Sequence, residues 1–155
     1  MSPKNPQIIN WHRAFGIAIK KLISDYGYHV KTEVEVSQQK QLLDLIIIRQ
    51  EQQKPIHQKA KLCDGFDNLS KHNLISYKSL HESFNTYAAE ELYSYYINYS
   101  KLDEQQALKL SRDDYQLYGI TTRMPKKLLQ TVRYKQTKPG IYDLNTQGKR
   151  IKNLP

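Results

Sequence analysis

The stretch Leu42-Leu43-Asp44-Leu45-Ile46-Ile47-Ile48 is apolar on both faces apart from one acid. It is too short for an ordinary helix and favours a central β-strand over residues 42–49 that is covered on both sides. A carboxylate in such a strand must be paired, bound to a metal or neutralised, because an isolated buried charge costs too much free energy. Asp44 is therefore a candidate metal ligand, with a salt bridge at the end of the strand as the structural alternative.

A second short strand is predicted over residues 73–78, after a polar loop. Its residues alternate, so that Leu74, Ser76 and Lys78 share one face. If the two strands lie side by side, Asp44 and Lys78 come together. A lysine in that place can orient a water molecule beside a phosphate and stabilise developing negative charge. Lys78 is therefore a candidate catalytic residue.

The segment from residue 84 to residue 99 is predicted to be an amphipathic helix. Its apolar stripe on the helical wheel consists of Phe84, Tyr87, Ala88, Leu92, Tyr95 and Tyr99. Glu91 falls inside this stripe, whereas Glu90 falls outside it. An acid on the buried face of a helix is unusual, so Glu91 is the candidate that would join Asp44 and Lys78 at one end of the sheet.

The remaining segments complete a single domain over residues 1–155. Helical spacing of apolar residues indicates helices, and alternation or β-rich composition indicates strands. The predicted elements are helices over residues 8–26 and 84–99, strands over residues 30–36, 42–49, 73–78 and 115–122, a basic helical turn over residues 125–130, and a C-terminal β-hairpin of residues 140–144 and 149–154. This α-β-β-β-α-β order predicts an α/β (α+β) fold with a central mixed sheet flanked by helices.

The first predicted helix has its own apolar stripe. The stripe consists of Ile8, Trp11, Phe15, Ala18, Ile19, Leu22 and Tyr26. Asn10 is the candidate N-cap of this helix, and Gly27 is its predicted end. Trp11 and His12, near its start, are interpreted as packing and capping residues rather than as ligands.

The composition of the 155-residue chain, 39% hydrophobic and 25% charged, is typical of a soluble globular protein. Cys63 is the only cysteine, which excludes an internal disulfide and suits a reducing cytosol. No secretory signal follows Met1, and the apolar runs are far shorter than the roughly 20 residues of a membrane-spanning helix. We therefore expect a cytoplasmic protein that does not enter a membrane.

Positive charge is concentrated in the C-terminal part of the chain. Of the formal net charge of +9, residues 123–155 carry +8, because they contain nine basic residues and one acid, Asp143. The basic residues are Arg123, Lys126, Lys127, Arg133, Lys135, Lys138, Lys149, Arg150 and Lys152. Lysine and arginine displace counterions from a nucleic-acid backbone, so this region is a candidate phosphate-binding surface. A solvated face is the structural alternative, and charge alone does not distinguish DNA from RNA or acidic lipid.

The positions of Asp44 and Lys78 resemble the motif of the PD-(D/E)xK nuclease superfamily, which has the restriction-endonuclease-like fold. That motif has an Asp on one strand and (D/E)-x-Lys on the next, within an α-β-β-β-α-β core. Asp44 matches the first acid and Lys78 matches the lysine. Ser76 stands where the second acid belongs, which is a departure from the motif.

Some restriction enzymes of this superfamily are similar in carrying S-x-K and placing the missing acid on the following helix, about 12 or 13 residues beyond the lysine. In this chain 12 residues separate Lys78 from Glu91, so the helical wheel and the family spacing select the same glutamate. The segment YKS-x-x-E, from Tyr77 to Glu82, also resembles small stand-alone bacterial proteins of this type. Glu82 is therefore the second choice for the relocated acid.

The resemblance implies a Mg²⁺- or Mn²⁺-dependent nuclease that hydrolyses phosphodiester bonds in DNA. Asp44 and Glu91 would bind the metal, Lys78 would act on the water, and Ser76 would support the site. Magnesium suits this role because it keeps several waters and needs only one or two protein carboxylates. Cleavage of two strands would favour a homodimer, although no residue demonstrates one.

Two alternatives remain open at this point. The loss of the acid at Ser76 favours a catalytically degenerate module that binds nucleic acid through its basic C-terminal region. In the other alternative, the chain is a protein-interaction domain in which Asp44, Lys78 and Glu91 form a buried ion network. Metal dependence separates the first alternative from an enzyme, and sensitivity to salt separates phosphate-driven binding from the second.

Overall fold

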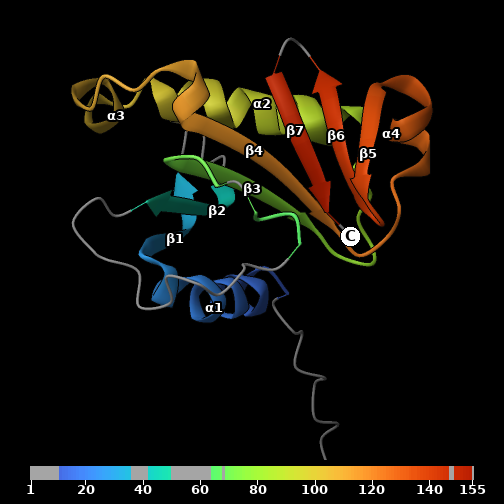
Figure 1. Ribbon diagram of the computed structural model, residues 1–155, viewed down its shortest axis with the longest axis horizontal. Coiled ribbons are helices and arrows are strands. Elements are labelled where there is room, and N and C mark those ends of the chain that lie inside the picture. The colour runs from blue at the N-terminus through green and yellow to red at the C-terminus, as the bar shows by residue number, and fades with distance from the viewer. Residues whose placement is uncertain (1–10, 36–41, 50–63, 68, 147–148, 155) are drawn as a thin grey trace, which may run out of the picture.

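The computed structural model describes residues 11–35, 42–49, 64–67, 69–146 and 149–154. These residues form a seven-stranded mixed sheet with helices on both faces (Figure 1). The helices are α1 (Trp11–Ile23), α2 (Thr86–Ser100), α3 (Asp103–Ala107) and α4 (Lys126–Thr131), with 3₁₀ turns at Ser24–Tyr26 and Arg112–Asp114. The strands are β1 (Tyr28–Glu35), β2 (Leu42–Arg49), β3 (His72–Lys78), β4 (Tyr115–Thr121), β5 (Arg133–Lys138), β6 (Ile141–Thr146) and β7 (Lys149–Leu154). Within these ranges no helix has the length and apolar character needed to cross a membrane.

The strands lie in the order β1-β2-β3-β4-β7-β6-β5. Strands β1, β2 and β3 form antiparallel pairs, whereas β3 pairs in parallel with β4, and β4 pairs in parallel with β7. Helix α2 makes the crossover between β3 and β4, as parallel neighbours require. These two strands therefore end at the same edge of the sheet, where Lys78 pairs with Thr121. The predicted mixed sheet flanked by helices is confirmed.

Strand β5 is absent from the elements predicted from the sequence. Five of its six residues are exposed, so it lacks the alternation of apolar and polar residues that marks a half-buried strand. As the edge strand beyond β6, it has a neighbour on one side only. The predicted C-terminal hairpin is present as β6 and β7, and β5 extends it into a three-stranded antiparallel unit.

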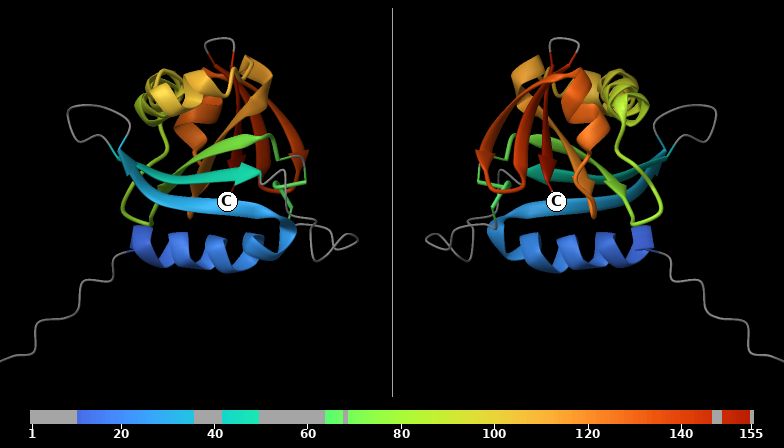
Figure 2. Two further views of the ribbon diagram at one scale, coloured as in Figure 1. Left: turned by 90° about the vertical axis from the view of Figure 1, so that its left-hand side faces the viewer. Right: turned by 90° about the vertical axis from the view of Figure 1, so that its right-hand side faces the viewer.

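Apolar side chains fill both faces of the sheet. Helix α1 covers one face, and α2 covers the other (Figure 2). The core on the α1 face includes Ile19, Ile23, Leu45, Ile75 and Tyr118. The core on the α2 face includes Leu74, Ala88, Leu92, Leu117 and Leu128. Strands β2 and β3 are therefore buried on both sides, as the apolar run in β2 predicted.

Helix α1 packs through only part of the predicted stripe, because Ile19 is buried and Phe15 packs against the core while other members are exposed. Its buried residues are Gly16, Ile19 and Ile23. Trp11 and Leu22, which belong to the predicted stripe, are 51% and 43% exposed. The cause is a close approach at Gly16, where an added Cβ would lie 2.9 Å from Cγ2 of Thr32 on β1. Because glycine lets the helix backbone come closest to the sheet, the face around Gly16 turns inward, and Trp11 and Leu22 turn outward.

Helix α2 also differs from its prediction in one respect. It begins at Thr86, with the Asn85 side chain accepting a hydrogen bond from the Ala88 N–H. Its buried residues are Ala88, Ala89, Leu92, Tyr95, Tyr96 and Tyr99. Tyr87 is 81% exposed and the Glu91 side chain is 45% exposed, so the prediction that both lie on the buried face is wrong. The inward face is set by buried residues three, four and seven positions apart, which leaves Glu91 at its edge.

The chain between β3 and α2 is anchored by one aromatic side chain. Phe84 is 2% exposed and belongs to the core on the α2 face. Its ring lies directly over the backbone of β4 at Gly119, where an added Cβ would lie 2.4 Å from Cζ of the ring. Only glycine leaves room for this contact. The Phe84 anchor positions residues 79–85, which carry Glu82 and precede Glu91.

We predict that Gly119→Ala destabilises the protein, although alanine is normally the better residue within a strand. The new methyl group would overlap the Phe84 ring, and overpacking of this kind costs about 1–3 kcal/mol. Urea unfolding measures the free energy of unfolding of each variant. In a Phe84→Leu background the same substitution should cost clearly less, because the overlapping ring is gone. An equal cost in both backgrounds would contradict this account of the glycine.

Candidate functional site

Each of the three residues that the sequence selected is connected to the end of β3: Lys78 lies there, and Asp44 and Glu91 are each joined to it by one contact. Lys78 Nζ lies 3.8 Å from Glu91 Oε2, which joins β3 to α2. The N–H of Tyr77, next to Lys78, donates to Asp44 Oδ2 at 2.8 Å, which joins β3 to β2. The Tyr95 hydroxyl hydrogen-bonds Glu91, and the charge of Asp44 acts on the same hydroxyl. Two acids and a lysine from three separate elements therefore share one end of the sheet.

Asp44 lies at a local distortion of strand β2. Leu43 and Ile46 both pack in the core on the α2 face, although strict alternation would place them on opposite faces. Across from Asp44, Glu33 on β1 has a φ of 51°, in the left-handed region that residues other than glycine rarely occupy. Regular pairs flank this point on both sides. This distortion explains why the Asp44 carboxylate does not lie on either apolar face of the buried strand β2.

Both oxygens of the Asp44 carboxylate have partners. His12 Nδ1 lies 2.6 Å from Oδ1, and the Tyr77 N–H donates to Oδ2. The Asp44 side chain is 19% exposed, so these contacts offset most of the cost of burying the charge. The salt bridge that the sequence offered as the structural alternative is therefore present when His12 is protonated.

His12, which was interpreted from the sequence as a packing or capping residue, contacts Asp44, and the sequence did not predict this contact. The two residues are 32 positions apart, and no local pattern connects them. The ring of Phe15, one turn further along α1, stacks on Tyr77 with 4.4 Å between centroids. This stacking places the first turn of α1 over the end of β3 and brings His12 to Asp44. A histidine one turn before an aromatic residue is common in helices, so this spacing does not predict the contact of His12 with Asp44.

Glu82, the second choice for the relocated acid, is engaged in a turn. Its Oε2 accepts hydrogen bonds from the Ser79 N–H at 3.1 Å and the Ser79 hydroxyl at 2.9 Å. Burial raises the pKa of Glu82, but the two hydrogen bonds from Ser79 together with the nearby Lys78 and His12 hold the pKa below its ordinary value. The same oxygen lies 3.6 Å from His12 Nε2. The geometry therefore favours Glu91 over Glu82 as the acid that acts with Lys78.

Ser76 is buried two residues before Lys78. It is 2% exposed and pairs with Gly119 on β4. An open cavity of about 530 Å³ is lined by Lys78, Glu82 and Glu91 among other residues, and neither Ser76 nor Asp44 belongs to its lining. The predicted role of Ser76 is therefore limited to that of a buried supporting residue.

A larger cavity, of about 630 Å³, lies away from these residues. Its lining includes Tyr115, Arg133, Lys135 and Asp143. Tyr115 pairs with His72 at the start of β3, so this cavity is at the opposite end of the parallel strands from Lys78. It contains none of the predicted site residues, and we place the candidate chemistry in the smaller cavity.

The acids of the site are hard oxygen ligands of the kind that Mg²⁺ prefers. Among the residues that the structure describes, no group of three or more His, Cys, Asp or Glu side chains is arranged to hold a metal ion. Magnesium needs only one or two carboxylates when water and a substrate phosphate complete its octahedron. Asp44 and Glu91 could therefore hold Mg²⁺ or Mn²⁺ together with a bound phosphate.

Tyr95 makes the stability of the folded protein depend on pH. Burial raises the pKa of Tyr95 well above the ordinary value of 10.0. The hydrogen bond to Glu91 raises this pKa further, and so do the negative charges of Glu91 and Asp44. The folded state thus holds the phenolic proton more tightly than the unfolded state. The resulting stabilisation is complete below about pH 10 and is lost as the pH rises above that value.

We therefore predict that the free energy of unfolding of Tyr95→Phe falls less steeply than that of the wild type between about pH 9 and pH 11. Urea unfolding at a series of pH values measures both slopes. Tyr134→Phe is the control, because Tyr134 is 49% exposed, and it should keep the wild-type slope. Equal slopes in the wild type and Tyr95→Phe would contradict the electrostatic environment described for Tyr95.

No family model matches the chain, and comparisons with curated proteins and with solved structures find no significant match. The geometry around Asp44, Lys78 and Glu91 therefore carries the functional argument. The same geometry also provides the residues with which a function can be tested.

Proposed function

We propose that the protein is a Mg²⁺-dependent nuclease that hydrolyses phosphodiester bonds in DNA. The observation that carries this proposal is that Glu91 from α2 lies beside Lys78 on β3, with 3.8 Å between Lys78 Nζ and Glu91 Oε2, while Asp44 from β2 accepts a hydrogen bond from the N–H of the neighbouring Tyr77. The element order α1-β1-β2-β3-α2-β4 supports the resemblance to the PD-(D/E)xK superfamily. In this proposal Glu91 replaces the acid that is absent at Ser76.

Each residue has a distinct part in the proposed reaction. A metal ion held by Asp44 and Glu91 would polarise the phosphate and lower the pKa of a bound water. Lys78 is 18% exposed, and its ammonium beside Glu91 can orient the attacking water and stabilise negative charge developing on the phosphate. The Tyr77 N–H and the Tyr95 hydroxyl hold the two carboxylates in place. Such preorganisation is what a phosphoryl-transfer site requires from its protein.

A second candidate function is a nucleic-acid-binding module without catalysis. Two observations favour it: Ser76 occupies the position of an acid, and His12 Nδ1 lies 2.6 Å from the Asp44 oxygen that a metal would need. In this module the ion pair of Lys78 and Glu91 would be structural. Metal-dependent properties of the Asp44 site separate the two functions.

We predict that Asp44→Asn, Lys78→Ala and Glu91→Gln each reduce cleavage at least about 100-fold, the usual loss when a group that stabilises the transition state is removed. Nicking of supercoiled plasmid by the purified protein, with Mg²⁺, with Mn²⁺ and with EDTA, measures the activity. Glu90→Gln is the matched control, because Glu90 is an exposed acid next to Glu91 on the same helix. It should keep the wild-type rate.

The pattern of results separates the alternatives. If Glu91→Gln keeps full activity while Lys78→Ala is inactive, the second acid is elsewhere, and Glu82→Gln is the next variant to measure. If the wild type cleaves neither DNA nor RNA with either metal, the nuclease proposal fails. Salt-sensitive binding of nucleic acid would then favour the non-catalytic module.

We also predict that Mg²⁺ raises the melting temperature of the wild type. An ion present at about ten times its Kd stabilises the folded state by about 1.4 kcal/mol, or about 3–6 °C for a protein of this size. Asp44→Asn should abolish this shift, and NaCl at matched ionic strength should not reproduce it. A shift of equal size in wild type and Asp44→Asn would show that the ion binds elsewhere.

A further inference from the structure

A third cavity adjoins the candidate active site. It has a volume of about 360 Å³ and lies between residues 80–85 and residues 123–128. Glu82, Ser83 and Asn85 line both this cavity and the one that contains Lys78 and Glu91. The two cavities are therefore neighbouring parts of one groove, which leads from the active site to the segment before and along α4.

Three cations line the part of the groove near α4. Arg123, Lys126 and Lys127 are all exposed, and in the described part of the chain none of them forms an ion pair with a carboxylate. Their charge is available for an anionic ligand. Among the described residues that line this part of the groove, the one acid is Glu82, whose Oε2 already accepts two hydrogen bonds from Ser79.

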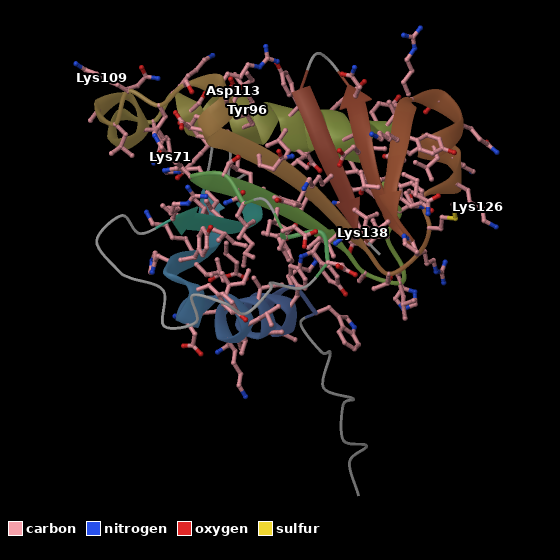
Figure 3. The ribbon with its side chains drawn as sticks, viewed as in Figure 1. Lys71, Tyr96, Lys109, Asp113, Lys126 and Lys138 are labelled. Carbon is pink, nitrogen blue, oxygen red and sulfur yellow. The ribbon has the colours of Figure 1, made fainter. Side chains whose placement is uncertain are left out.

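Two other cations of the basic C-terminal region, Lys138 and Lys152, already have partners. Lys138 Nζ lies 2.7 Å from Asp64 and 2.8 Å from Asp67, and these acids raise its pKa. Lys152 lies over the ring of Tyr118, with 6.0 Å between its Nζ and the centroid. Figure 3 shows Lys126 projecting from α4 at the edge of the molecule, well apart from Lys138. The basic C-terminal region is therefore not one continuous surface, and the cations of the groove are a separate group.

Tyr87 gives the other part of the groove an exposed aromatic face. It lies in the first turn of α2, is 81% exposed, and lines the cavity that contains Lys78 and Glu91. At the α4 end, Leu80 and Met124 are 52% and 54% exposed and line the third cavity. Exposed aromatic and apolar side chains beside cations are what unpaired nucleotides require, since their bases stack and their phosphates need positive charge. The bases of a duplex are already stacked on one another and offer no free face.

The walls of the groove are held in place by the fold. Phe84 anchors one wall on Gly119, and the Asn85 side chain caps α2 below Tyr87. The hydroxyls of Thr86 and Thr131 lie 3.4 Å apart and join the start of α2 to the end of α4. A ligand would therefore enter a groove that needs little rearrangement, which lowers the entropy cost of binding.

We propose that this groove binds a single, unpaired DNA strand and leads it into the active site. Tyr87 stacks on a base next to the scissile phosphate, and Arg123, Lys126 and Lys127 contact the phosphates beyond it. This inference rests on the proposed function, because it specifies the substrate class of that nuclease as DNA that is single-stranded at the site of cleavage.

Binding is tested in the full chain with Lys78→Ala, which prevents cleavage during the measurement. Fluorescence anisotropy compares a labelled single-stranded oligonucleotide with the duplex of the same sequence. We expect the single strand to bind at least about 10-fold more tightly, and Tyr87→Ala to weaken its binding about 10-fold. Tyr87→Trp should keep the affinity, since tryptophan also stacks. Lys126→Ala with Lys127→Ala should lower the slope of log K against log salt by about 1.4.

The control pair is Arg133→Ala with Lys135→Ala, two exposed cations of β5 outside the groove. It should leave the affinity for the single strand within about twofold. Loss of strand binding in the groove variants but not in this pair supports the inference, whether or not the wild type cleaves DNA. Equal binding of strand and duplex overturns it, as does an unchanged affinity in Tyr87→Ala. Cleavage that depends on Lys78 and Glu91 would in that case leave the proposed function standing.

Discussion

The partly buried carboxylate of Asp44 imposes the constraint on which the site depends. A charge that is 19% exposed in an otherwise apolar strand needs hydrogen-bond donors on both oxygens, because water no longer supplies them. The donors come from different parts of the chain, His12 on α1 and the backbone of Tyr77 on β3. Satisfying one side chain thereby fixes a helix and a neighbouring strand relative to β2, and it gathers the residues that surround Lys78.

The neighbouring contacts extend this arrangement over the rest of the site. Tyr95 holds Glu91 from within α2, and Lys78 balances its charge across the gap between β3 and the helix. Phe84 fixes the chain between the two elements by packing where β4 has no side chain at Gly119. Each group that would touch a substrate is thus supported by a buried or backbone group that would not. Sites of this kind keep their geometry without bound substrate, and a single supporting contact can matter as much as a reacting group.

The sequence predicted those parts of the fold and site that depend on local pattern. The apolar run around Asp44, the alternation before Lys78 and Gly27, which ends the 3₁₀ turn after α1 with a φ of 79°, all carry local signals. The contact of His12 with Asp44 has no local signal in the sequence, because it depends on how α1 is rotated on the sheet. That rotation is set by the close backbone approach at Gly16 rather than by the largest side chains. Strand β5 was not predicted for a related reason. Its residues are polar on both faces, so its pairing with β6, and not its sequence pattern, makes it a strand.

The arrangement of charge matters more for function than the net charge of +9. Lys138 is paired with two acids, and Arg133 and Lys135 line a cavity at the far end of β4 from Lys78. A seven-residue strand such as β4 spans about 20 Å, which is about twice the Debye length at 0.1 M salt. A phosphate at Lys78 is therefore largely screened from those distant cations, whereas Lys126 and Lys127 lie along the groove that opens onto it. If nucleic acid is the ligand, these nearby charges determine how it approaches, and most of the positive charge counted in the sequence adds only general attraction.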